Sequence, residues 1–332
     1  MSEKPTVSVW IACYYAGEYI AEAIESVLSQ RTEYAYEIVI NDDCSGDNSW
    51  EVISEYVKKY PDIISAKRNE SNLGLCANVL ATKLRCKGQF IVNLSADDYW
   101  IDENKIQKQV DFLISHPNYV GVGSKVEIRY GRSGVASSSY PKEKHLGRDY
   151  TVSDYNNNVN LPSHGFMMRN IFQDQVNRPV VDKVYSLVDS IDDLFDPVLY
   201  LQFGKIFIMP DATCVYRVEP VKEGKHNFNS KNSPIVKASI LIDGYNKMDA
   251  IQFEGVDLRK RYTVSMNVAI LWGLAKGKMK EAKALYQTIP EKYRHPFYNS
   301  VAFHCLFFGV IKAGFHQVIN RINRSKAIKE LS

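Results

Sequence analysis

Two pairs of adjacent carboxylates are the residues of this chain whose types and spacing point most directly to chemistry. Asp42 and Asp43 follow one apolar run, and Asp97 and Asp98 follow another at residues 90–94. Adjacent carboxylates repel each other, so folded proteins keep them where a cation or hydrogen-bond donors offset the charge. If both runs are neighbouring parallel strands, the pairs meet at the carboxyl edge of the sheet, where α/β proteins bind ligands. The pattern therefore predicts a metal-assisted nucleotide-sugar site.

Each acidic pair also has a purely structural interpretation. Asp and Ser are favoured in turns and at helix N-termini, so either pair alone could simply end a strand. Two pairs at equivalent ends of strands in one sheet favour the chemical interpretation. A nucleotide diphosphate leaves more readily when Mg²⁺ or Mn²⁺ disperses its developing charge. We therefore expect Mn²⁺ or Mg²⁺ as a cofactor, held by one or two of these carboxylates.

Strand-like and helix-like patterns alternate along the first third of the chain and would position the acidic pairs. Short apolar runs predict strands near residues 7–12, 38–40, 63–67 and 90–94, and apolar positions at helical spacing predict helices near 19–28, 52–57, 75–84 and 106–113. Strands that alternate with helices indicate βαβ units. The sequence therefore predicts an α/β fold with a mostly parallel, doubly wound sheet flanked by helices.

The pattern is less regular after residue 120. Residues 131–160 are rich in Ser, Gly, Asn, Lys and Tyr and predict a long surface loop, whereas the chain from about residue 232 predicts helices. We expect one domain over residues 1–230, with a nucleotide-sugar half at about 1–120 and an acceptor half at 121–230. A helical C-terminal extension at 231–332 would follow it.

Bulk composition narrows the class of protein. The 332 residues are 45% hydrophobic and 24% charged, as in ordinary soluble proteins, and a net charge of +3 is too small to suggest a nucleic-acid partner. No apolar run reaches the roughly 18 residues of a membrane span. The first residues carry no signal-peptide pattern, and the six cysteines show no paired spacing. We therefore expect a cytoplasmic protein with reduced thiols.

Several blocks of the first 120 residues resemble family 2 of the inverting glycosyltransferases, which have the GT-A fold, in its bacterial surface-polysaccharide type. The blocks occur in family order at residues 7–14, 17–30, 42–47, 72–78, 88–91 and 96–109. The resemblance implies a Rossmann-like GT-A sheet. It also implies transfer of a hexosyl or N-acetylhexosaminyl group, with inversion, from a nucleotide-diphosphate donor. By family habit the donor is a UDP-sugar, and the acceptor is a hydroxyl of a glycan or lipid-linked glycan.

The resemblance implies a role for each matching residue. Asp42 would accept a hydrogen bond from the base of the donor nucleotide, and the turn at Tyr14 would flank that base. Asp97 matches the last acid of the family's Asp-x-Asp metal motif, and Asp98 matches the acid after it. The implied donor-binding residues are Tyr14, Asp42, Asp43, Asn78, Asp98 and Arg217, and the implied metal ligands are Asp97, Asp98 and His226.

Three positions depart from the family pattern. Ser95 stands where the metal motif has its first acid, and it could hold a water or a ribose hydroxyl instead. Cys44 replaces the Gly that usually follows the paired acids, and Tyr15 replaces the Asn after Tyr14. These changes bear on the identity of the donor rather than on the class of reaction.

An inverting transfer needs a general base on the face opposite the leaving diphosphate. The family places this base before an apolar helix that leads to Gly-Lys, a strand and Tyr-Arg. Asp193 fits that position best and Asp192 lies beside it, although both could instead be N-terminal carboxylates that stabilise the helix. His164 matches a position that lines the acceptor side, and its alternative is a structural histidine beside an apolar strand.

The last predicted helix, from about residue 298, has two interpretations. Its apolar stripe comprises Phe303, Phe307, Ile311, Phe315, Val318 and Ile322, and basic residues accompany it. Such a stripe usually packs on the body of a protein. It also suits an interfacial helix at anionic head groups, which would serve a lipid-linked acceptor on the inner face of the plasma membrane.

Other classes of function remain to be weighed. A sugar nucleotidyltransferase needs a basic, Gly-rich loop after its first strand, and residues 13–17 contain no Lys or Arg. A nicotinamide dehydrogenase would show G-x-G-x-x-G there, which is absent. A degenerate, non-catalytic transferase that binds a glycan or a protein partner is the remaining alternative, because Ser95 weakens the metal motif.

Overall fold

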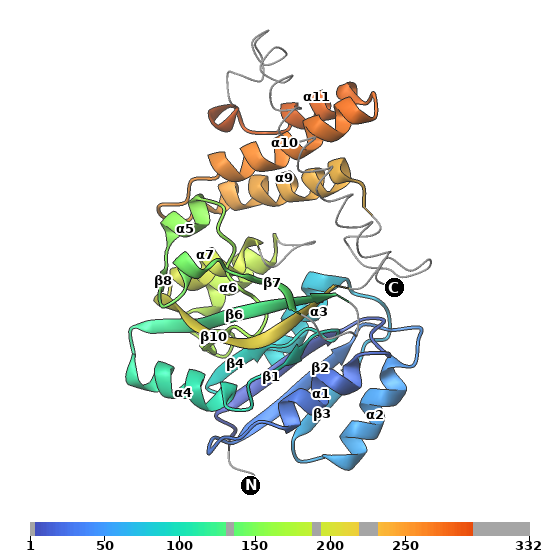
Figure 1. Ribbon diagram of the computed structural model, residues 1–332, viewed down its shortest axis with the longest axis vertical. Coiled ribbons are helices and arrows are strands. Elements are labelled where there is room, and N and C mark those ends of the chain that lie inside the picture. The colour runs from blue at the N-terminus through green and yellow to red at the C-terminus, as the bar shows by residue number, and fades with distance from the viewer. Residues whose placement is uncertain (1–3, 131–135, 188–193, 219–231, 295–332) are drawn as a thin grey trace. The chain divides into compact units, whose positions relative to one another are not determined.

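One ten-stranded sheet forms the frame of the protein (Figure 1). The computed structural model describes residues 4–130, 136–187, 194–218 and 232–294. The strands are β1 (Val7–Cys13), β2 (Tyr36–Asp42), β3 (Ile64–Arg68), β4 (Phe90–Asn93), β5 (Tyr99–Trp100), β6 (Tyr119–Tyr130), β7 (Ala136–Tyr140), β8 (Arg148–Tyr150), β9 (Met167–Arg169) and β10 (Lys205–Val218). Their main order is β3-β2-β1-β4-β9-β6-β10-β5.

The first half of the sheet has the predicted topology. Strands β3, β2, β1 and β4 are parallel neighbours, which confirms the α/β fold. The second half is mixed, because the short β9 runs antiparallel to both β4 and β6, whereas β10 runs parallel to β6. Strand β1 therefore lies between β2 and β4, the two strands that carry the acidic pairs.

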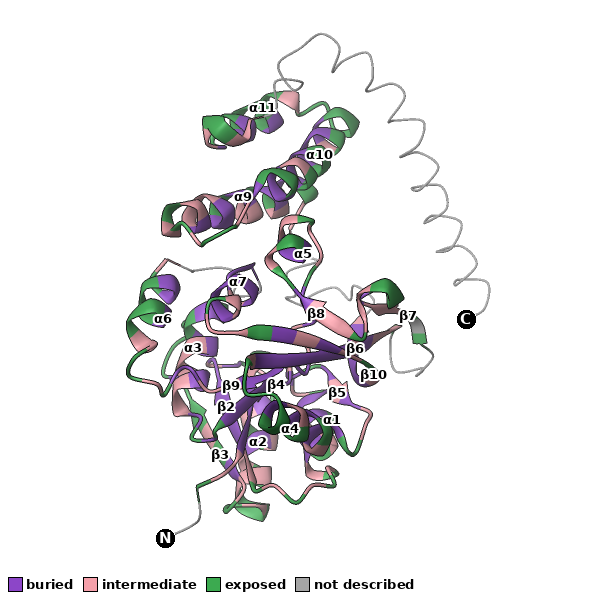
Figure 2. Ribbon diagram, turned by 90° about the vertical axis from the view of Figure 1, so that its left-hand side faces the viewer, coloured by how far each residue is buried: buried purple, intermediate pink, exposed green. Residues whose placement is uncertain are grey.

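Helices cover both faces of the sheet. They are α1 (Ile20–Leu28), α2 (Ser49–Lys59), α3 (Leu75–Arg85), α4 (Lys105–Ser115), α5 (Val152–Asn156), α6 (Arg178–Tyr185) and α7 (Asp196–Leu201). Side chains alternate between faces along a strand. Val9 and Ile11 of β1 accordingly join the apolar core formed with α1, α2 and α4, while Trp10 faces Lys83 of α3. Figure 2 shows the buried central strands and the exposed outer faces of the helices.

The prediction of a long surface loop at residues 131–160 is wrong for its described part. Strand β7 pairs with β6 and β8 pairs with β10, and a capping box at Thr151 and Asp154 begins α5. Arg148 adds an ion pair with Asp154 at 2.6 Å. The polar sequence hid these strands, because their pairing depends on long neighbouring strands rather than on an apolar face of their own.

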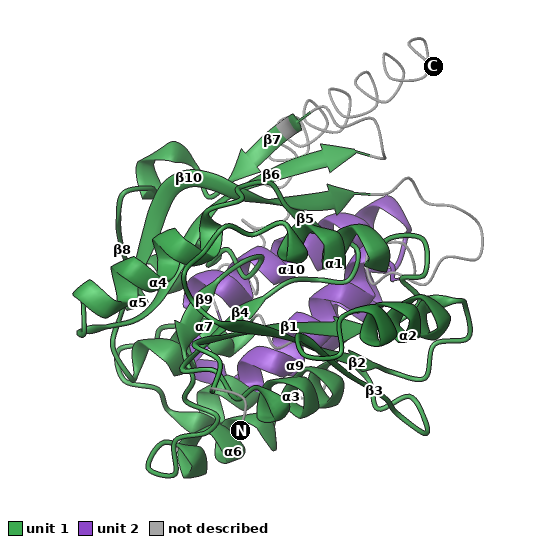
Figure 3. Cartoon of the chain, turned by 90° about the horizontal axis from the view of Figure 1, so that it is seen from below, with its two compact units in different colours: residues 1–231, 247–257 green, residues 232–246, 258–332 purple. Residues whose placement is uncertain are grey.

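By its internal contacts the chain divides into two compact units, coloured separately in Figure 3: Met1–Lys231 with Lys247–Asp257, and Asn232–Asn246 with Leu258–Ser332. The second unit holds the first part of α9 (Pro234–Ile251), α10 (Arg259–Ala275) and α11 (Met279–Gln287). Tyr262 is central to it, since its ring contacts those of Tyr245 and Tyr293 and its hydroxyl donates to Asn246.

The C-terminal helical extension predicted from the sequence is confirmed by α9 to α11, up to residue 294. Within the ranges that the structure describes, no helix is both long and apolar enough to cross a membrane. The apolar stripe predicted near the C-terminus falls at residues 303–322, outside the described residues.

Candidate donor and acceptor site

The two acidic pairs lie on either side of the same strand. Cys13 at the end of β1 is in register with Asp42 of β2, and Trp10 is in register with Asn93 of β4, just before the second pair. All three strands are parallel, so their carboxyl ends form one edge. The sequence-based expectation that the pairs converge on this edge matches the arrangement of the strands.

Asp42 is buried at the end of β2 and already has internal partners. Its carboxylate accepts hydrogen bonds from the backbone N–H and the hydroxyl of Ser45, and Nε of Arg68 lies 3.3 Å from Oδ2. Ser45 Oγ also accepts from the N–H of Tyr15, at 3.0 Å. Asp42 therefore holds together the turns that follow β1 and β2.

Asp43 fastens the loop before α3. Its carboxylate accepts from the backbone N–H groups of Leu73 and Gly74 at 2.8 and 3.0 Å, and from Nδ2 of Asn69 at 2.8 Å. Asn78 is buried beside it, donating to the carbonyl of residue 41 at 3.2 Å and accepting from Asn69 at 3.0 Å. Both predicted donor-binding residues thus shape residues 69–74 through internal bonds.

Two tyrosines at the end of β1 expose aromatic surface at this edge. Tyr14 and Tyr15 are each 46% exposed, and their rings meet edge to face with centroids 4.7 Å apart. Tyr15 adopts a positive φ of 53°, which turns the chain sharply after β1. A planar base could stack on such exposed rings.

Asp98 links three segments at the end of β4. Its Oδ1 accepts from the backbone N–H of Arg217 at 2.8 Å, and its Oδ2 lies 3.2 Å from Nε2 of His164. Burial, reinforced by the charge of Asp97, raises the pKa of Asp98 well above its ordinary value. Burial also lowers the pKa of His164 to about 4, and Nδ1 of that ring meets the hydroxyl of Tyr140.

The opposite pKa shifts of Asp98 and His164 have one cause, and both are consistent with one arrangement of protons. Burial disfavours the charged form of both groups. A neutral imidazole can accept a hydrogen bond at Nε2 and donate one at Nδ1. A protonated Oδ2 of Asp98 would then donate to Nε2 of His164, and Nδ1 of His164 would donate to the hydroxyl of Tyr140. Without that proton, Oδ2 is a buried oxygen with no hydrogen bond. His164 thus lies against Asp98, at the acidic edge of the sheet.

The side chain of Arg217 is held internally. Its guanidinium lies between the rings of Tyr19 and Tyr99, at 4.9 and 5.1 Å, and Nη2 donates to Glu22 of α1 at 2.6 Å. Its Nε is buried and has no hydrogen-bond partner. Arg217 is a predicted donor-binding residue, and the structure places it beside Asp98, to which its backbone N–H donates.

The carboxylates fit a divalent cation that takes most of its ligands from the substrate. Asp97 is exposed at the edge, whereas the oxygens of Asp98 face His164 and the N–H of Arg217. Among the described residues, no group of three or more His, Cys, Asp or Glu could enclose a metal ion. Mg²⁺ and Mn²⁺ commonly need only one or two carboxylates when phosphate oxygens and waters complete the shell. The third predicted ligand, His226, lies outside the described residues.

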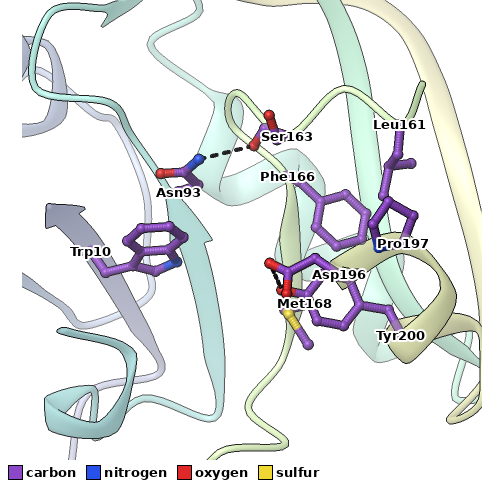
Figure 4. A pocket seen from close by; sticks show the side chains of 9 residues that line it. All are labelled: Trp10, Asn93, Leu161, Ser163, Phe166, Met168, Asp196, Pro197 and Tyr200. Atoms are coloured by element: carbon purple, nitrogen blue, oxygen red, sulfur yellow. Dashed lines mark hydrogen bonds between the residues drawn. The ribbon is translucent and has the colours of Figure 1, made fainter. Parts of the chain in front are cut away.

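A small cavity of about 30 Å³ lies beside this edge (Figure 4). It is lined by Trp10, Asn93, Leu161, Ser163, Phe166, Met168, Asp196, Pro197 and Tyr200. Nδ2 of Asn93 donates to the carbonyl of Ser163 at 3.3 Å, which ties β4 to the segment that carries His164. A cavity of this size has room for one or two waters or a single substituent of a sugar.

Asp196 brings a buried lysine to the wall of this cavity. Nζ of Lys83 lies 2.6 Å from Oδ2 of Asp196 and also donates to the hydroxyls of Tyr185 and Tyr200. This network was not predicted from the sequence, although a lysine on the inward face of α3 was a usable signal. Asp192 and Asp193, the predicted bases, precede Asp196 and lie outside the described residues.

Comparison with known proteins decides the family. The model of glycosyl transferase family 2 matches residues 8–174, which include both acidic pairs and His164. The chain belongs to glycosyl transferase family 2. This membership confirms the resemblance that the sequence blocks indicated.

Relatives of this family 2 chain are 30–32% identical to it over the parts that align. An uncharacterised protein of Mycobacterium tuberculosis is 30% identical over 213 residues, covering 64% of this chain and 58% of that protein. This chain therefore spans little more than half the length of that relative. In Escherichia coli, UDP-Glc:alpha-D-GlcNAc-diphosphoundecaprenol beta-1,3-glucosyltransferase WfaP is 32% identical, covering 49% of this chain and 73% of the enzyme.

Solved structures confirm the GT-A fold of the family 2 chain. Residues 1–349 of TarS from Staphylococcus aureus, in complex with UDP, superpose with a TM-score of 0.57 and 16% identity over 87% of this chain and 82% of that TarS chain. The mannosyltransferase PcManGT of Pyrobaculum calidifontis, in complex with GDP-Man and Mn²⁺, gives 0.53 and 15% identity over 86% and 75%. At these identities the likeness concerns the fold alone.

Proposed function

We propose that this protein is an inverting glycosyltransferase that moves a sugar from a UDP-sugar to a hydroxyl of a glycan or lipid-linked glycan. The observation that carries the proposal is the placement of Asp42-Asp43 and Asp97-Asp98 on either side of β1, within a family 2 match. The E. coli relative is named for a UDP-glucose donor and a diphosphoundecaprenol-linked acceptor. The UDP in the TarS structure also supports a uridine nucleotide.

The donor half of the site would bind the nucleotide along the edge of β1 and β2. Tyr14 would flank the base, and Asp42 would accept from it as its bonds to Ser45 rearrange. Asp43 and Asn78 would act indirectly, because their polar atoms hold residues 69–74 as one wall of the base pocket. Arg217 would support the diphosphate end through the positive charge of its guanidinium.

The transfer itself needs a base and a stabilised leaving group. Asp193, or Asp192 beside it, would take the proton of the acceptor hydroxyl, whose oxygen then bonds to the anomeric carbon as the bond to the diphosphate breaks. Attack opposite the leaving group inverts that carbon. Asp97, with Asp98 and His226, would hold Mn²⁺ or Mg²⁺, which supplies positive charge to the diphosphate. Mn²⁺ in the PcManGT structure supports this cofactor.

The acceptor would approach past His164 and the cavity lined by Trp10 and Asn93. His164 would line the acceptor side with its ring, because its two nitrogens already meet Asp98 and Tyr140. For a lipid-linked acceptor, we propose a cytoplasmic protein with peripheral membrane contact through the apolar stripe of residues 303–322. A non-catalytic glycan- or partner-binding role is the second candidate, and Ser95 in the metal motif is the observation that favours it. Nothing comparable favours a sugar nucleotidyltransferase.

Calorimetric titration of UDP with Mn²⁺ and with EDTA tests the donor site. We expect metal-dependent binding that is lost in Asp97→Ala and retained in Asp62→Ala, an exposed acid before β3. Asp193→Asn should abolish transfer from a UDP-sugar while it retains UDP binding. Wild-type protein that binds UDP but transfers no sugar from a broad donor panel would favour the binding role. Absence of UDP binding under both conditions would contradict the proposal.

A further inference from the structure

We propose that Lys105 and Gln109 of α4 are positioning residues for His164. They hold the carbonyl of Gly165 and thereby fix the adjacent imidazole against Asp98. The inference rests on the proposed function, because it explains how one wall of the same site is kept in place. It concerns residues that lie behind the site and touch no substrate.

Two donors from one helix converge on a single carbonyl. Nζ of Lys105 donates to the oxygen of Gly165 at 2.6 Å, and Nε2 of Gln109 donates to the same oxygen at 3.1 Å. The two side chains also bond to each other, since Oε1 of Gln109 accepts from Nζ at 2.8 Å. Both are completely buried. The carbonyl is thus held from two directions by a pair that is itself cross-linked.

The turn of residues 163–166, which carries His164, is also constrained by its own backbone. Gly165 has a φ of +71°, and a Cβ there would lie 2.9 Å from Cε and Nζ of Lys105. Its N–H donates to the carbonyl of Asn93 at 3.1 Å, and the N–H of Phe166 donates to the carbonyl of Ser163 at the same distance. The turn that carries His164 therefore lies between the end of β4 and the Lys105 ammonium.

Simple packing does not explain a lysine at this position. The other inward positions of α4 are mainly apolar, including Ile106, Val110 and Leu113. A buried ammonium costs more free energy than an apolar side chain of similar size unless acceptors offset the loss of water. The acceptors of Lys105 are Gln109 and the Gly165 carbonyl, and its Nζ also lies 5.2 Å from the centre of the Trp100 ring. Nζ of Lys105 therefore directs its hydrogen bonds to Gln109 and to the backbone carbonyl next to His164.

The expected consequence of removing the ammonium is local. The Gly165 carbonyl would keep only the longer bond from Gln109, and the turn could relax into the space that Nζ leaves. Such a shift would alter the 3.2 Å separation of His164 Nε2 and Asp98 Oδ2. A small displacement in a reaction site can cost far more activity than stability.

The test compares Lys105→Met with Lys108→Met, a matched change on the same helix. Lys108 is 44% exposed and pairs only with Asp102 among the ion pairs of the described residues. The imidazole nitrogens are observed by NMR in protein labelled at histidine, with His164→Gln used to assign the signal. We expect Lys105→Met to shift the His164 resonances and to lower kcat about tenfold, with the UDP affinity and donor KM unchanged. Lys108→Met should match the wild type in every measurement.

Gln109→Met removes the second donor and serves if Lys105→Met does not fold. It should shift the same resonances by a smaller amount. His164 resonances that stay at their wild-type positions in the folded variants would overturn the proposal, even if kcat falls, because the residues would then be structural. If the wild type transfers no sugar, the proposed function fails, yet a shifted His164 signal would still support the positioning role.

Discussion

At the scale of single residues, the protein is unusual in burying two lysines completely or almost so. Lys83 is 1% exposed and Lys105 is 0% exposed. Each has oxygen partners, but the partners differ, because Lys83 pairs with the carboxylate of Asp196 whereas Lys105 relies on neutral acceptors. The two sites should therefore respond differently to substitution and to pH.

Lys83→Met should lower the free energy of unfolding by about 3 kcal/mol or more, because it leaves the Asp196 carboxylate buried without its cation. Chemical denaturation measures this change. Replacing both partners, as in Lys83→Met with Asp196→Leu, should recover part of the loss. If Lys83→Met lowers the free energy of unfolding no more than Lys108→Met does, the assignment of Lys83 to a buried ion pair is contradicted.

Lys105 makes stability depend on pH. Burial lowers the pKa of Lys105 to about 7, whereas an unfolded lysine titrates near its model value of 10.5. Between these values the unfolded chain binds more protons than the folded chain, so the contribution of Lys105 to stability rises with pH. From about pH 6 to about pH 9, the wild type should gain stability relative to Lys105→Met, by an amount on the order of 1 kcal/mol or more. Paired unfolding curves test this, and a flat difference would contradict it.

At the scale of elements, the strands that carry the site are held by side chains that cap their ends. Asp43, at the end of β2, binds two backbone N–H groups of residues 69–74 and so fixes the loop before α3. This loop borders the proposed base pocket, which makes its order a condition for binding the nucleotide. The loop has little apolar burial of its own, since Leu73 and Leu75 are 49% and 56% exposed.

Asp43→Ala should release this loop, since it leaves three donors without their acceptor at a cost of about 1–3 kcal/mol for each group that stays buried. Hydrogen exchange of the amides of Leu73 and Gly74 should become faster, and UDP affinity should fall. Asp62→Ala is the matched control at an exposed acid. Unchanged protection of the two amides would show that the loop is held by other contacts.

The sequence predicted the elements near the site better than the contacts within it. Strands β1, β2 and β4 followed from short apolar runs, because a buried strand needs apolar residues on both faces, whereas the edge strand β3 is buried only at Ile64. Strands β7 and β8 did not, because they are polar and pair with strands distant in sequence. The contact of Asp98 with Arg217 joins residues 119 positions apart and depends on the register of β10, which no local pattern encodes. The buried lysines stand at inward helix positions, which was a local signal, but their partners at Asp196 and Gly165 come from distant segments.

At the scale of the whole molecule, the described site residues belong to the first compact unit, and α10 and α11 belong to the second. Helix α10 exposes Val264, Val268, Leu271 and Leu274 by 37–43%. The basic C-terminal residues follow α11 in the chain. Membrane contact is proposed for that end of the protein, and it can be tested without any substrate.

The combined variant Arg324→Glu, Lys326→Glu and Lys329→Glu should reduce binding of the full chain to vesicles that contain phosphatidylserine. Each basic residue near an anionic surface contributes about 1 kcal/mol, so the loss should exceed tenfold. Cosedimentation measures it, with Lys58→Glu and Lys59→Glu as the control on exposed lysines of α2. Equal binding by all three proteins would remove the membrane contact from the proposal.

The bond between Asp98 and β10 has a consequence for which substitutions the protein tolerates. Oδ1 of Asp98 accepts from the main-chain N–H of residue 217, so this link persists with any side chain there that keeps the N–H. Proline alone lacks that donor. In a saturation library selected for folding, position 217 should therefore reject proline more strongly than any residue that removes only the guanidinium contacts, while position 98 should accept few residues. The donor of this hydrogen bond belongs to the main chain and the acceptor to a side chain, so substitutions at the two positions would affect it differently.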